Sequence, residues 1–310
     1  MDKPVVTNAA LLEAARDGLT RGRKTMEPKW LYDAAGSELF VQITELPEYY
    51  PTRTEERILR EHLERLAAQV PSRAELVELG SGASSKTRLL LDRLDALASY
   101  VPIDVSSDFL DATATELAAD YPELEITPVV GDFTEPLALP PEAGPRVAFF
   151  PGSTIGNLDP AAAVALLEEV RSWPGIRAFI LGVDLVKDPG TLVRAYDDAA
   201  GVTAAFNLNL LHRMNREIGT DFDTERFAHR AVWNAEEARI EMHLVSQADQ
   251  RVHVGDRTAE FAAGETIHTE SSRKFTRRSL EALCGSAGWR IADFLSDDAE
   301  MFGVAVLVPM

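Results

Sequence analysis

Short apolar runs alternate with amphipathic stretches through the middle of the chain. The apolar runs have the length of buried strands and are AELVELGSG, SYVPIDVS, EITPVVGDF, RVAFFPGSTIGN and IRAFILGVDLV. Apolar residues at helical spacing lie between them, in SSKTRLLLDRLDAL, DFLDATATELAADY and PAAAVALLEEVRSW. Strands that alternate with helices form a mostly parallel sheet with right-handed crossovers. The pattern therefore predicts an α/β fold, with a doubly wound, mostly parallel, Rossmann-like sheet.

This alternation is absent from both flanks of the region. The first fifty residues predict amphipathic helices, and a charged helix is expected at residues 52–70. Later in the chain the pattern predicts more helices, then an antiparallel hairpin over residues 227–254, and finally a helix and two strands that complete the first sheet. We therefore expect one α/β domain at residues 53–186 and 275–310, and a second, smaller α+β domain at residues 1–52 and 187–274.

Composition and charge limit the partners of the chain. Of its 310 residues, 45% are apolar and 26% are charged, which is the balance of a soluble globular protein. The formal net charge of −19 would repel nucleic acid and anionic membranes. Cys284 is the only cysteine, which excludes an intrachain disulfide and fits a reducing compartment. Because neither a membrane span nor a secretory signal is present, we expect a cytoplasmic protein, and a monomer by default.

A glycine turn follows the first predicted strand. Glu78 comes near the end of that strand, and Gly80 and Gly82 allow the backbone to turn tightly and to approach a ligand closely. A nicotinamide dinucleotide fingerprint would need a third glycine where the chain has Ser85. The Glu78 carboxylate would also repel a pyrophosphate, but it would not repel a sulfonium. These features favour S-adenosylmethionine over a nicotinamide cofactor.

Acidic residues also end the next two predicted strands. Asp104 lies where this architecture binds ribose hydroxyl groups, although a helix N-cap is an equally good interpretation of Asp104 alone. Asp132 and Phe133 end the third strand, where they would address the adenine amino group and ring. Lys86, at the start of the helix after the glycine turn, would either reach the cofactor or lie in solvent. At the ends of successive strands, these signals together point to an S-adenosylmethionine site.

Five separated motifs add a more specific indication. They are YDAAGSELFVQITELPEYYPTRTE, VELGSGASSKT, FFPGSTIGN, DLVKDPGTLVRAYDDAAGVTAAFN and TESSRKF. Together, over nearly the whole chain, they resemble the ergothioneine-pathway histidine N-alpha-methyltransferases. The resemblance implies three successive methyl transfers from S-adenosylmethionine to the α-amine of free L-histidine, which give hercynine. It also implies that the first domain binds the cofactor and that the smaller domain binds the substrate.

The resemblance also implies roles for residues at the backbone end of the substrate. Asn157 and Tyr196 would hold the carboxylate, and both are neutral hydrogen-bond donors. Tyr32 and Phe40 would flank the amine, where aromatic rings suit an amine that becomes permanently cationic. Gly152 would present its backbone near the amine. Tyr32 and Gly152 are therefore the residues expected closest to the chemistry, with Tyr32 or water as the proton acceptor.

A second set of residues would recognise the imidazole. Tyr49 would touch one edge of the ring, with Glu270 and Ser272 on the other edge and Met242 lining the pocket. Alternation along a strand places Glu270 and Ser272 on one face. A carboxylate and a hydroxyl group are complementary to the two nitrogen atoms of imidazole, and such a site rejects rings that lack these groups. The resemblance does not place His243, next to Met242, and its effect on the shape of the pocket stays open.

Other interpretations remain open from the sequence. Tyr49 would be an ordinary interface aromatic, Asn157 an Asx-turn residue, and the strand of Glu270 and Ser272 a solvated edge. The alternative functions are an N-methyltransferase of the same fold that acts on another amino acid such as tryptophan, or a non-catalytic S-adenosylmethionine-binding regulator. The carboxylate and hydroxyl pair favours histidine over an indole, which has only one N–H. Neither a metal site nor covalent catalysis is expected, because the histidine spacing and the lone cysteine do not support them.

Overall fold

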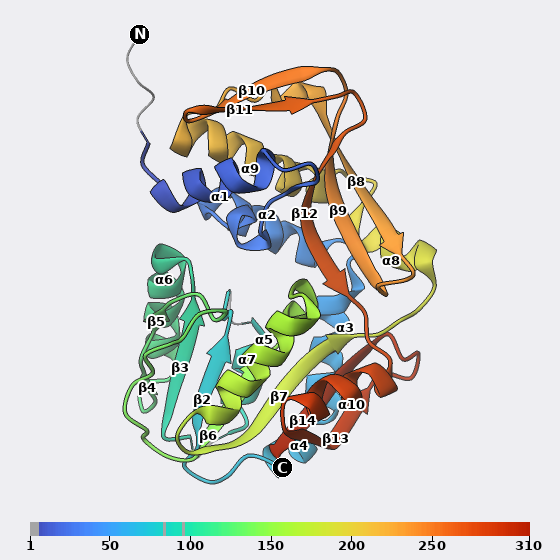
Figure 1. Cartoon of the computed structure of the whole chain (residues 1–310). Coiled ribbons are helices and arrows are strands. Elements are labelled where there is room, and N and C mark those ends of the chain that lie inside the picture. Colours follow the sequence, from blue (N-terminus) through green and yellow to red (C-terminus); the bar gives the residue numbers. More distant parts are fainter. Residues whose placement is uncertain (1–5, 83–84, 95–96) are drawn as a thin grey trace. The chain divides into compact units, whose positions relative to one another are not determined.

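The chain divides into two compact units (Figure 1). A computed structural model describes residues 6–82, 85–94 and 97–310. The larger unit consists of Tyr50–Lys187 and Ser272–Met310, and the smaller unit consists of Met1–Tyr49 and Asp188–Ser271. The sequence predicts domain divisions at residues 53, 187 and 275. The substrate-binding role of the smaller unit stays a prediction.

The larger unit is built on a mostly parallel sheet (Figure 1). Its strands are β2 (Glu75–Leu79), β3 (Ser99–Asp104), β4 (Glu125–Ile126), β5 (Val129–Val130), β6 (Arg146–Phe150), β7 (Ile176–Asp184), β13 (Trp289–Ser296) and β14 (Phe302–Pro309). The strand order is β13-β14-β7-β6-β2-β3-β4, with β5 paired to β3. β2 pairs in parallel with β3 and β6, whereas β14 is antiparallel to β7 and β13. The predicted doubly wound α/β fold is confirmed, including the two C-terminal strands.

Helices cover both faces of this sheet. They are α3 (Tyr50–Glu61), α4 (Leu63–Ala67), α5 (Ser85–Leu91), α6 (Ser107–Asp120), α7 (Pro160–Ser172) and α10 (Arg277–Ser286). Adjacent residues of β2 belong to different apolar clusters. Val77 packs with α7 and α10, whereas Leu76 packs with α3, α4 and α5. Burial on both faces is typical of a parallel strand between helix layers. Cys284 on α10 is buried in the first cluster, and burial raises its pKa to about 12, as expected of a structural thiol.

Two helices of the larger unit differ from their predicted bounds. The expected helix at residues 52–70 is divided at His62 into α3 and α4, although backbone hydrogen bonds of helical spacing continue across the division. The predicted helix at residues 84–97 corresponds to the shorter α5. Parts of that prediction, at residues 83–84 and 95–96, lie outside the described residues.

The smaller unit combines helices with two small sheets. Its elements are α1 (Ala9–Leu19), β1 (Lys24–Thr25), α2 (Ala34–Glu45), α8 (Pro189–Tyr196), α9 (Val202–Ile218), β8 (Phe227–Asn234), β9 (Arg239–Ser246), β10 (Gln250–Val254), β11 (Arg257–Phe261) and β12 (Thr266–Arg273). One sheet has the order β1-β12-β9-β8, and the other pairs β10 with β11. The helix α9 ends at Gly219, whose φ of 65° is the left-handed conformation common at helix ends.

The late hairpin is partly as predicted. β8 and β9 are antiparallel, with Phe227 opposite Ser246, as the alternation predicts. The expectation that the same hairpin extends to residue 254 is wrong, because β10 pairs with β11 instead. The two strands are joined across Gly255 and Asp256, and the positive φ of Gly255 (63°) suits a two-residue hairpin loop.

Candidate active site

The glycine turn lies at the carboxyl end of β2, where the strand order reverses between β3 and β6. Gly80 and Gly82 have φ angles of 67° and 48°, a conformation that favours glycine. The Gly80 N–H donates to Ile103 O at 2.9 Å, and the Gly82 N–H donates to Asp104 Oδ2 at 3.1 Å. These bonds join the ends of β2 and β3. Doubly wound sheets bind their ligands at such a reversal.

Asp104, the last residue of β3, anchors the backbone on two sides. Its Oδ2 accepts the Gly82 N–H, and its Oδ1 accepts the Ser106 N–H at 3.0 Å. The N-cap of α6 is Ser106, so the N-cap interpretation of Asp104 is wrong. A carboxylate has about four acceptor sites, and the bonds to described residues leave two of them. They suit the two hydroxyl groups of a ribose, and this role stays a prediction.

Asp132 and Phe133 follow β5, whose Val130 pairs with Asp104. Asp132 Oδ1 accepts hydrogen bonds from Thr134 N at 2.9 Å and from Thr134 Oγ1 at 2.5 Å, which fixes the loop. The Phe133 ring packs edge-on against Phe150, with 5.1 Å between ring centroids. The structure therefore brings both predicted adenine-binding residues to the carboxyl ends of the parallel strands, where Asp104 also lies.

The residues at the carboxyl ends of these strands fit S-adenosylmethionine. A side chain on Gly80 would come within 3.5 Å of the Phe133 ring, so glycine leaves the space beside that ring open. Among the described residues, no atom lies within 4 Å of the corresponding position on Gly82. An aromatic face, a carboxylate at Asp104 and an open glycine backbone match the adenine, ribose and amino acid parts of this cofactor.

Glu78 lies beneath the turn and is fully buried. Its carboxyl group accepts hydrogen bonds from Thr87 Oγ1, at 2.5 Å, and from Tyr100 OH. Burial raises the Glu78 pKa to about 7, although both hydrogen bonds and nearby Lys86 oppose the shift. These contacts give Glu78 a structural role in holding α5 and β3 to β2. Its predicted contact with the cofactor stays a prediction.

Glu78→Gln is expected to gain stability relative to the wild type as pH rises. The folded pKa of about 7 lies above the ordinary 4.5, so the folded protein retains a proton that the unfolded chain loses between these values. Wild-type stability therefore falls across this window by up to about 3 kcal/mol through this group, and the Gln variant lacks the effect. Denaturant unfolding of both proteins at about pH 5 and pH 8 measures it. A stability difference that is independent of pH would contradict a protonated Glu78.

Lys86 and Gly152 are joined by a buried residue that the sequence analysis missed. Glu55 on α3 is fully buried, and its Oε2 lies 2.6 Å from Lys86 Nζ and accepts the Gly152 N–H at 2.8 Å. Lys86 is therefore paired with a carboxylate and is not a solvated surface lysine. The spacing of apolar residues could have revealed that Glu55 is buried. Glu55 precedes the buried Ile58 and Leu59 by three and four residues and so shares their helix face.

Gly152 opens the loop that carries Asn157. Gly152 and Ser153 both have left-handed φ angles, 76° and 59°, and Ser153 Oγ accepts the Asp184 N–H at 2.8 Å. Asn157 ends the short 3₁₀ helix Thr154–Asn157 and is half-buried. Within the described part of the chain the Asn157 side chain makes no hydrogen bond, so it does not close an Asx turn. Its predicted role in binding the substrate carboxylate stays a prediction.

Aromatic side chains from distant segments form one cluster in the smaller unit. Tyr32 lies edge-on to Phe40 and to Phe206, with centroid distances of 5.6 and 5.3 Å. Phe40 also packs against Tyr49 at 6.2 Å, and Tyr49 packs against Tyr196 at 6.0 Å. Four predicted substrate residues are therefore brought together. Phe206 was missed, although it lies within the motif DLVKDPGTLVRAYDDAAGVTAAFN.

Glu270 and Ser272 lie on β12 and are nearly inaccessible to solvent. Their exposed fractions are 7% and 3%, whereas Ser271 and Arg273 are half-buried. The interpretation of this segment as a solvated strand edge is therefore wrong. A buried carboxylate in a strand needs polar partners. Recognition of the imidazole by Glu270 stays a prediction.

The strand β12 is irregular just before Glu270. Adjacent residues Thr269 and Glu270 are both buried, which breaks the alternation of a regular strand. The His268 ring stabilises the break, because its Nε2 lies 3.0 Å from Glu270 O and 3.1 Å from Ser271 Oγ. A carbonyl oxygen only accepts, so Nε2 carries the proton. His268 and Ser271 thus share one face of the sheet, and Glu270 lies on the other.

Met242 and His243, adjacent on β9, point to opposite faces. The His243 ring stacks on His268 at 5.0 Å, and its Nε2 lies 3.2 Å from Glu241 Oε2. Since His268 lies on the face opposite Glu270, His243 does so too. Met242, which is 2% exposed, therefore shares the face of Glu270. The pocket role of Met242 stays a prediction, and the effect of His243 on that pocket stays open.

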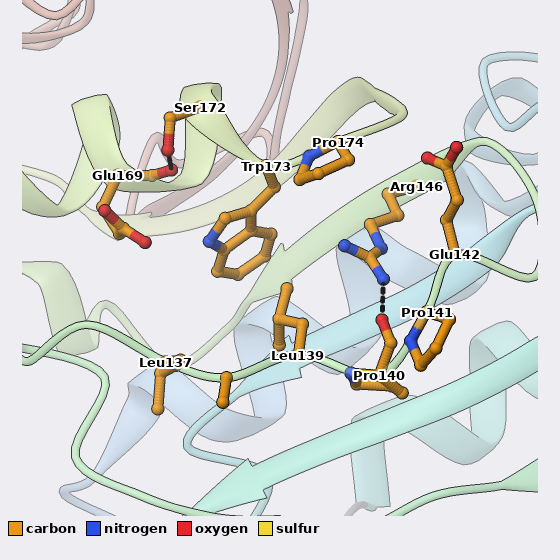
Figure 2. Close-up of a pocket in the computed structure, with 11 residues that line it drawn as sticks. Leu137, Leu139, Pro140, Pro141, Glu142, Arg146, Glu169, Ser172, Trp173 and Pro174 are labelled. Carbon is orange, nitrogen blue, oxygen red and sulfur yellow. Dashed lines mark hydrogen bonds between the residues drawn. The ribbon is translucent and has the colours of Figure 1, made fainter.

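A separate pocket lies at the other end of the parallel strands, away from the glycine turn (Figure 2). Leu139, Arg146 and Trp173 are among its lining residues. Arg146 begins β6, and its guanidinium donates to Pro140 O and to Glu75 Oε1. The pocket therefore lies at the amino ends of the parallel strands, whereas such sheets bind substrates and cofactors at the carboxyl ends. We assign it no part in the candidate site.

Two further kinds of feature are absent from the described residues. No group of three or more histidine, cysteine, aspartate or glutamate side chains in these ranges is placed to hold a metal ion. None of the helices in residues 6–82, 85–94 and 97–310 combines the length and the apolar character that a bilayer crossing requires.

Known proteins are similar to this chain over nearly its full length. A family model described as histidine-specific methyltransferase, SAM-dependent, matches residues 11–309. The chain is 48% identical to the histidine N-alpha-methyltransferase of Mycolicibacterium smegmatis, over 96% of this chain and 95% of that protein. The Mycobacterium tuberculosis protein of the same name is 47% identical, over 96% and 94%. Ergothioneine biosynthesis protein 1 of Neurospora crassa is 30% identical over 86% of this chain and 31% of that protein.

Proposed function

The chain belongs to the family of histidine-specific, S-adenosylmethionine-dependent methyltransferases, and on that premise we propose that it trimethylates the α-amine of free L-histidine. The product is hercynine, and the pathway is ergothioneine biosynthesis. The observation that carries the choice of histidine is the buried pair Glu270 and Ser272 on β12. Few side chains other than imidazole would satisfy both a carboxylate and a hydroxyl group at one edge of a ring.

The larger unit supplies the residues that hold the cofactor. Asp104 would bind the ribose hydroxyl groups, and Asp132 and Phe133 would contact the adenine. When bound, S-adenosylmethionine supplies an electrophilic methyl group on a cationic sulfur. Lys86 is held by Glu55 at 2.6 Å, so its charge is offset and does not oppose a cationic ligand.

The aromatic cluster of the smaller unit suits the amine. The amine attacks only in its neutral form, and much of the acceleration of such a displacement comes from positioning. As methyl groups are added, the nitrogen loses its N–H groups and keeps a positive charge, which aromatic rings accommodate better than hydrogen-bond acceptors do. Tyr32 and Phe40 present such rings, and Phe206 packs against Tyr32 and supports it.

Carboxylate recognition is the proposed role of Asn157 and Tyr196. Both side chains donate hydrogen bonds without adding charge. Tyr196 ends α8 and packs against Tyr49, which fixes its ring. A substrate without the carboxylate would lose these bonds.

The alternative acceptor is another amino acid, such as tryptophan. An indole offers one N–H donor and no ring acceptor, so it can pair with only one of the two polar groups at Glu270 and Ser272. The hydrogen bond that is lost would contribute about 0.5–1.5 kcal/mol, or about 2- to 13-fold in affinity. A non-catalytic regulator is disfavoured, because it has no need of groups for both the carboxylate and the amine.

We also propose that the protein acts in the cytoplasm as a monomer with no nucleic-acid partner. The formal net charge of −19 supports the absence of nucleic-acid binding. A single, buried cysteine is consistent with a reducing compartment.

A panel of amino acids tests the proposed substrate. We expect incubation with S-adenosylmethionine to methylate L-histidine and to leave tryptophan and phenylalanine unchanged, as measured by product mass. Histamine, which lacks the carboxylate, and imidazole propionate, which lacks the amine, serve as matched controls and should not react. Conversion of tryptophan at the rate of histidine would favour the alternative acceptor.

A further inference from the structure

One face of α9 holds the segment of the smaller unit that carries Tyr32. Four side chains of α9, each three or four residues from the next, lie on this face, and they are Phe206, Asn209, Arg213 and Arg216. The Phe206 ring packs against Tyr32, with 5.3 Å between centroids. The other three side chains make hydrogen bonds to residues near Tyr32 in the chain. A single helix therefore contacts both the Tyr32 ring and the backbone that carries it.

Asp33, which follows Tyr32, is bonded to α9 and to α2. Its Oδ1 accepts hydrogen bonds from Asn209 Nδ2 at 2.7 Å and from the Gly36 N–H at 2.8 Å. Its Oδ2 pairs with Arg216. Burial tends to raise the Asp33 pKa, but the hydrogen bonds that the carboxyl group accepts outweigh burial and lower the pKa. Asp33 is therefore ionised at neutral pH, and its bond to Asn209 is charge-assisted.

The backbone on the other side of Tyr32 is also bonded to α9. Arg213 Nη1 donates to Trp30 O at 2.9 Å, and the Arg213 guanidinium lies over the Trp30 ring, 5.6 Å from its centroid. The Tyr32 N–H donates to Lys29 O at 3.3 Å, which closes a short turn. Because Trp30 and Asp33 are both attached to α9, the direction of the Tyr32 side chain between them is fixed by that helix.

These contacts determine the position of the Tyr32 ring, whatever the partners of its hydroxyl group. Tyr32 and Phe40 are half-buried, whereas Phe206 is 2% exposed. Phe206 therefore supports the other two rings, and accessible ring surface remains on Tyr32 and Phe40. If the substrate amine lies at these two rings, their positions decide how well a cation is accommodated.

We propose that Asn209 is a positioning residue, which acts through Asp33 to hold the Tyr32 ring where the third methyl transfer requires it. This role rests on the proposed function, in which Tyr32 and Phe40 flank the amine. In each transfer the nitrogen lone pair forms the new N–C bond, and the S–C bond breaks with its electron pair left on sulfur. Positive charge thereby passes from sulfur to nitrogen.

The third transfer differs from the first two in what can stabilise that charge. After the first and second transfers the nitrogen carries an N–H, which can donate to an oxygen atom or be lost as a proton. After the third transfer no N–H remains, so the aromatic rings are the groups that can still stabilise the charge. A displaced Tyr32 ring should therefore slow the third transfer more than the first. A smaller amount of folded protein would instead slow all transfers in proportion.

Kinetics of the full chain with separate substrates test the inference. L-histidine and Nα,Nα-dimethyl-L-histidine are each incubated with saturating S-adenosylmethionine, and product mass gives kcat/KM for each. Asn209→Leu removes the amide and keeps the branching of the side chain. We expect it to lower kcat/KM for the dimethyl substrate by about 2- to 30-fold more than kcat/KM for histidine. Starting from histidine, this variant should accumulate dimethylhistidine.

Two variants control for the substitution at Asn209. Asn215→Leu makes the same change on the same helix, but Asn215 donates to Phe222 O at 2.8 Å and does not contact the Tyr32 segment. It should keep the wild-type ratio of the two kcat/KM values. Phe40→Leu removes a ring of the aromatic cluster and should lower the ratio as Asn209→Leu does. An unchanged ratio in Phe40→Leu would contradict the inference, because the rings would then not act on the third transfer.

The outcomes separate this inference from the proposed function. If the wild type methylates neither substrate, the proposed function is contradicted and the inference fails with it. If the wild type forms the trimethyl product and Asn209→Leu lowers both kcat/KM values equally, only the inference is contradicted. A greater loss for histidine than for the dimethyl substrate would also overturn it. If Asn209→Leu does not fold, Arg213→Met decides, because it breaks the bond to Trp30 O, and an unchanged ratio there overturns the inference.

Discussion

Asp104→Ala is expected to lower the affinity for S-adenosylmethionine by roughly 100- to 10,000-fold. Asp104 would accept two hydrogen bonds from the ribose, and each bond to a charged group contributes about 1.5–3 kcal/mol. Its carboxylate also holds Gly82 and Ser106, so its loss loosens the glycine turn as well. Isothermal titration calorimetry with S-adenosylmethionine measures the change.

Two variants control for this experiment. Asp104→Asn keeps one acceptor oxygen and should show an intermediate loss of affinity. Asp111→Ala removes the same charge from an exposed position on α6 and should bind the cofactor like the wild type. If Asp104→Ala binds the cofactor as tightly as the wild type, the ribose site lies elsewhere.

Glu270→Ala should weaken histidine binding by roughly 10- to 100-fold and leave cofactor binding unchanged. The variant removes one charge-assisted hydrogen bond to the imidazole, which contributes about 1.5–3 kcal/mol. Glu270 is 7% exposed, so little water can enter to replace its carboxylate. Calorimetry with histidine, in the presence of S-adenosylhomocysteine, measures the loss.

Matched substitutions separate recognition from folding at this position. Glu270→Gln keeps an acceptor and should lose less affinity than Glu270→Ala. Glu236→Ala removes a carboxylate from the exposed turn between β8 and β9 and should have no effect. If Glu270→Ala loses histidine and cofactor binding together, the residue maintains the fold and does not recognise the substrate.

The parts of the fold set by local patterning could be predicted from the sequence. Apolar residues on both faces of β2, such as Leu76 and Val77, indicate a strand between two helix layers, and the structure shows this arrangement. The glycine turn was equally predictable, because only a few residues decide its conformation. Strand pairing was less predictable. Gly255 and Asp256 are typical residues of a hairpin loop. The alternation of apolar and polar residues from β9 into β10 instead suggested that β10 belongs to the β8–β9 hairpin.

Candidate site residues that belong to a recognisable motif could be predicted from the sequence. Residues that hold those motif residues in place could not. Glu55 reads as part of a charged surface helix, yet it is buried and joins Lys86 to Gly152. The irregularity of β12 depends on the His268 side chain, which period-two reasoning does not include. Such contacts link residues far apart in the chain or depart from regular geometry, so neither composition nor spacing reveals them.

The most direct test of the central claim is the identity of the product formed from free L-histidine. With excess S-adenosylmethionine, the account predicts a single end product heavier than histidine by three methylene units. Fragmentation should place all three methyl groups on the α-nitrogen, with three cofactor molecules consumed for each histidine. No methylated histidine, or methyl groups on the imidazole ring, would contradict the account.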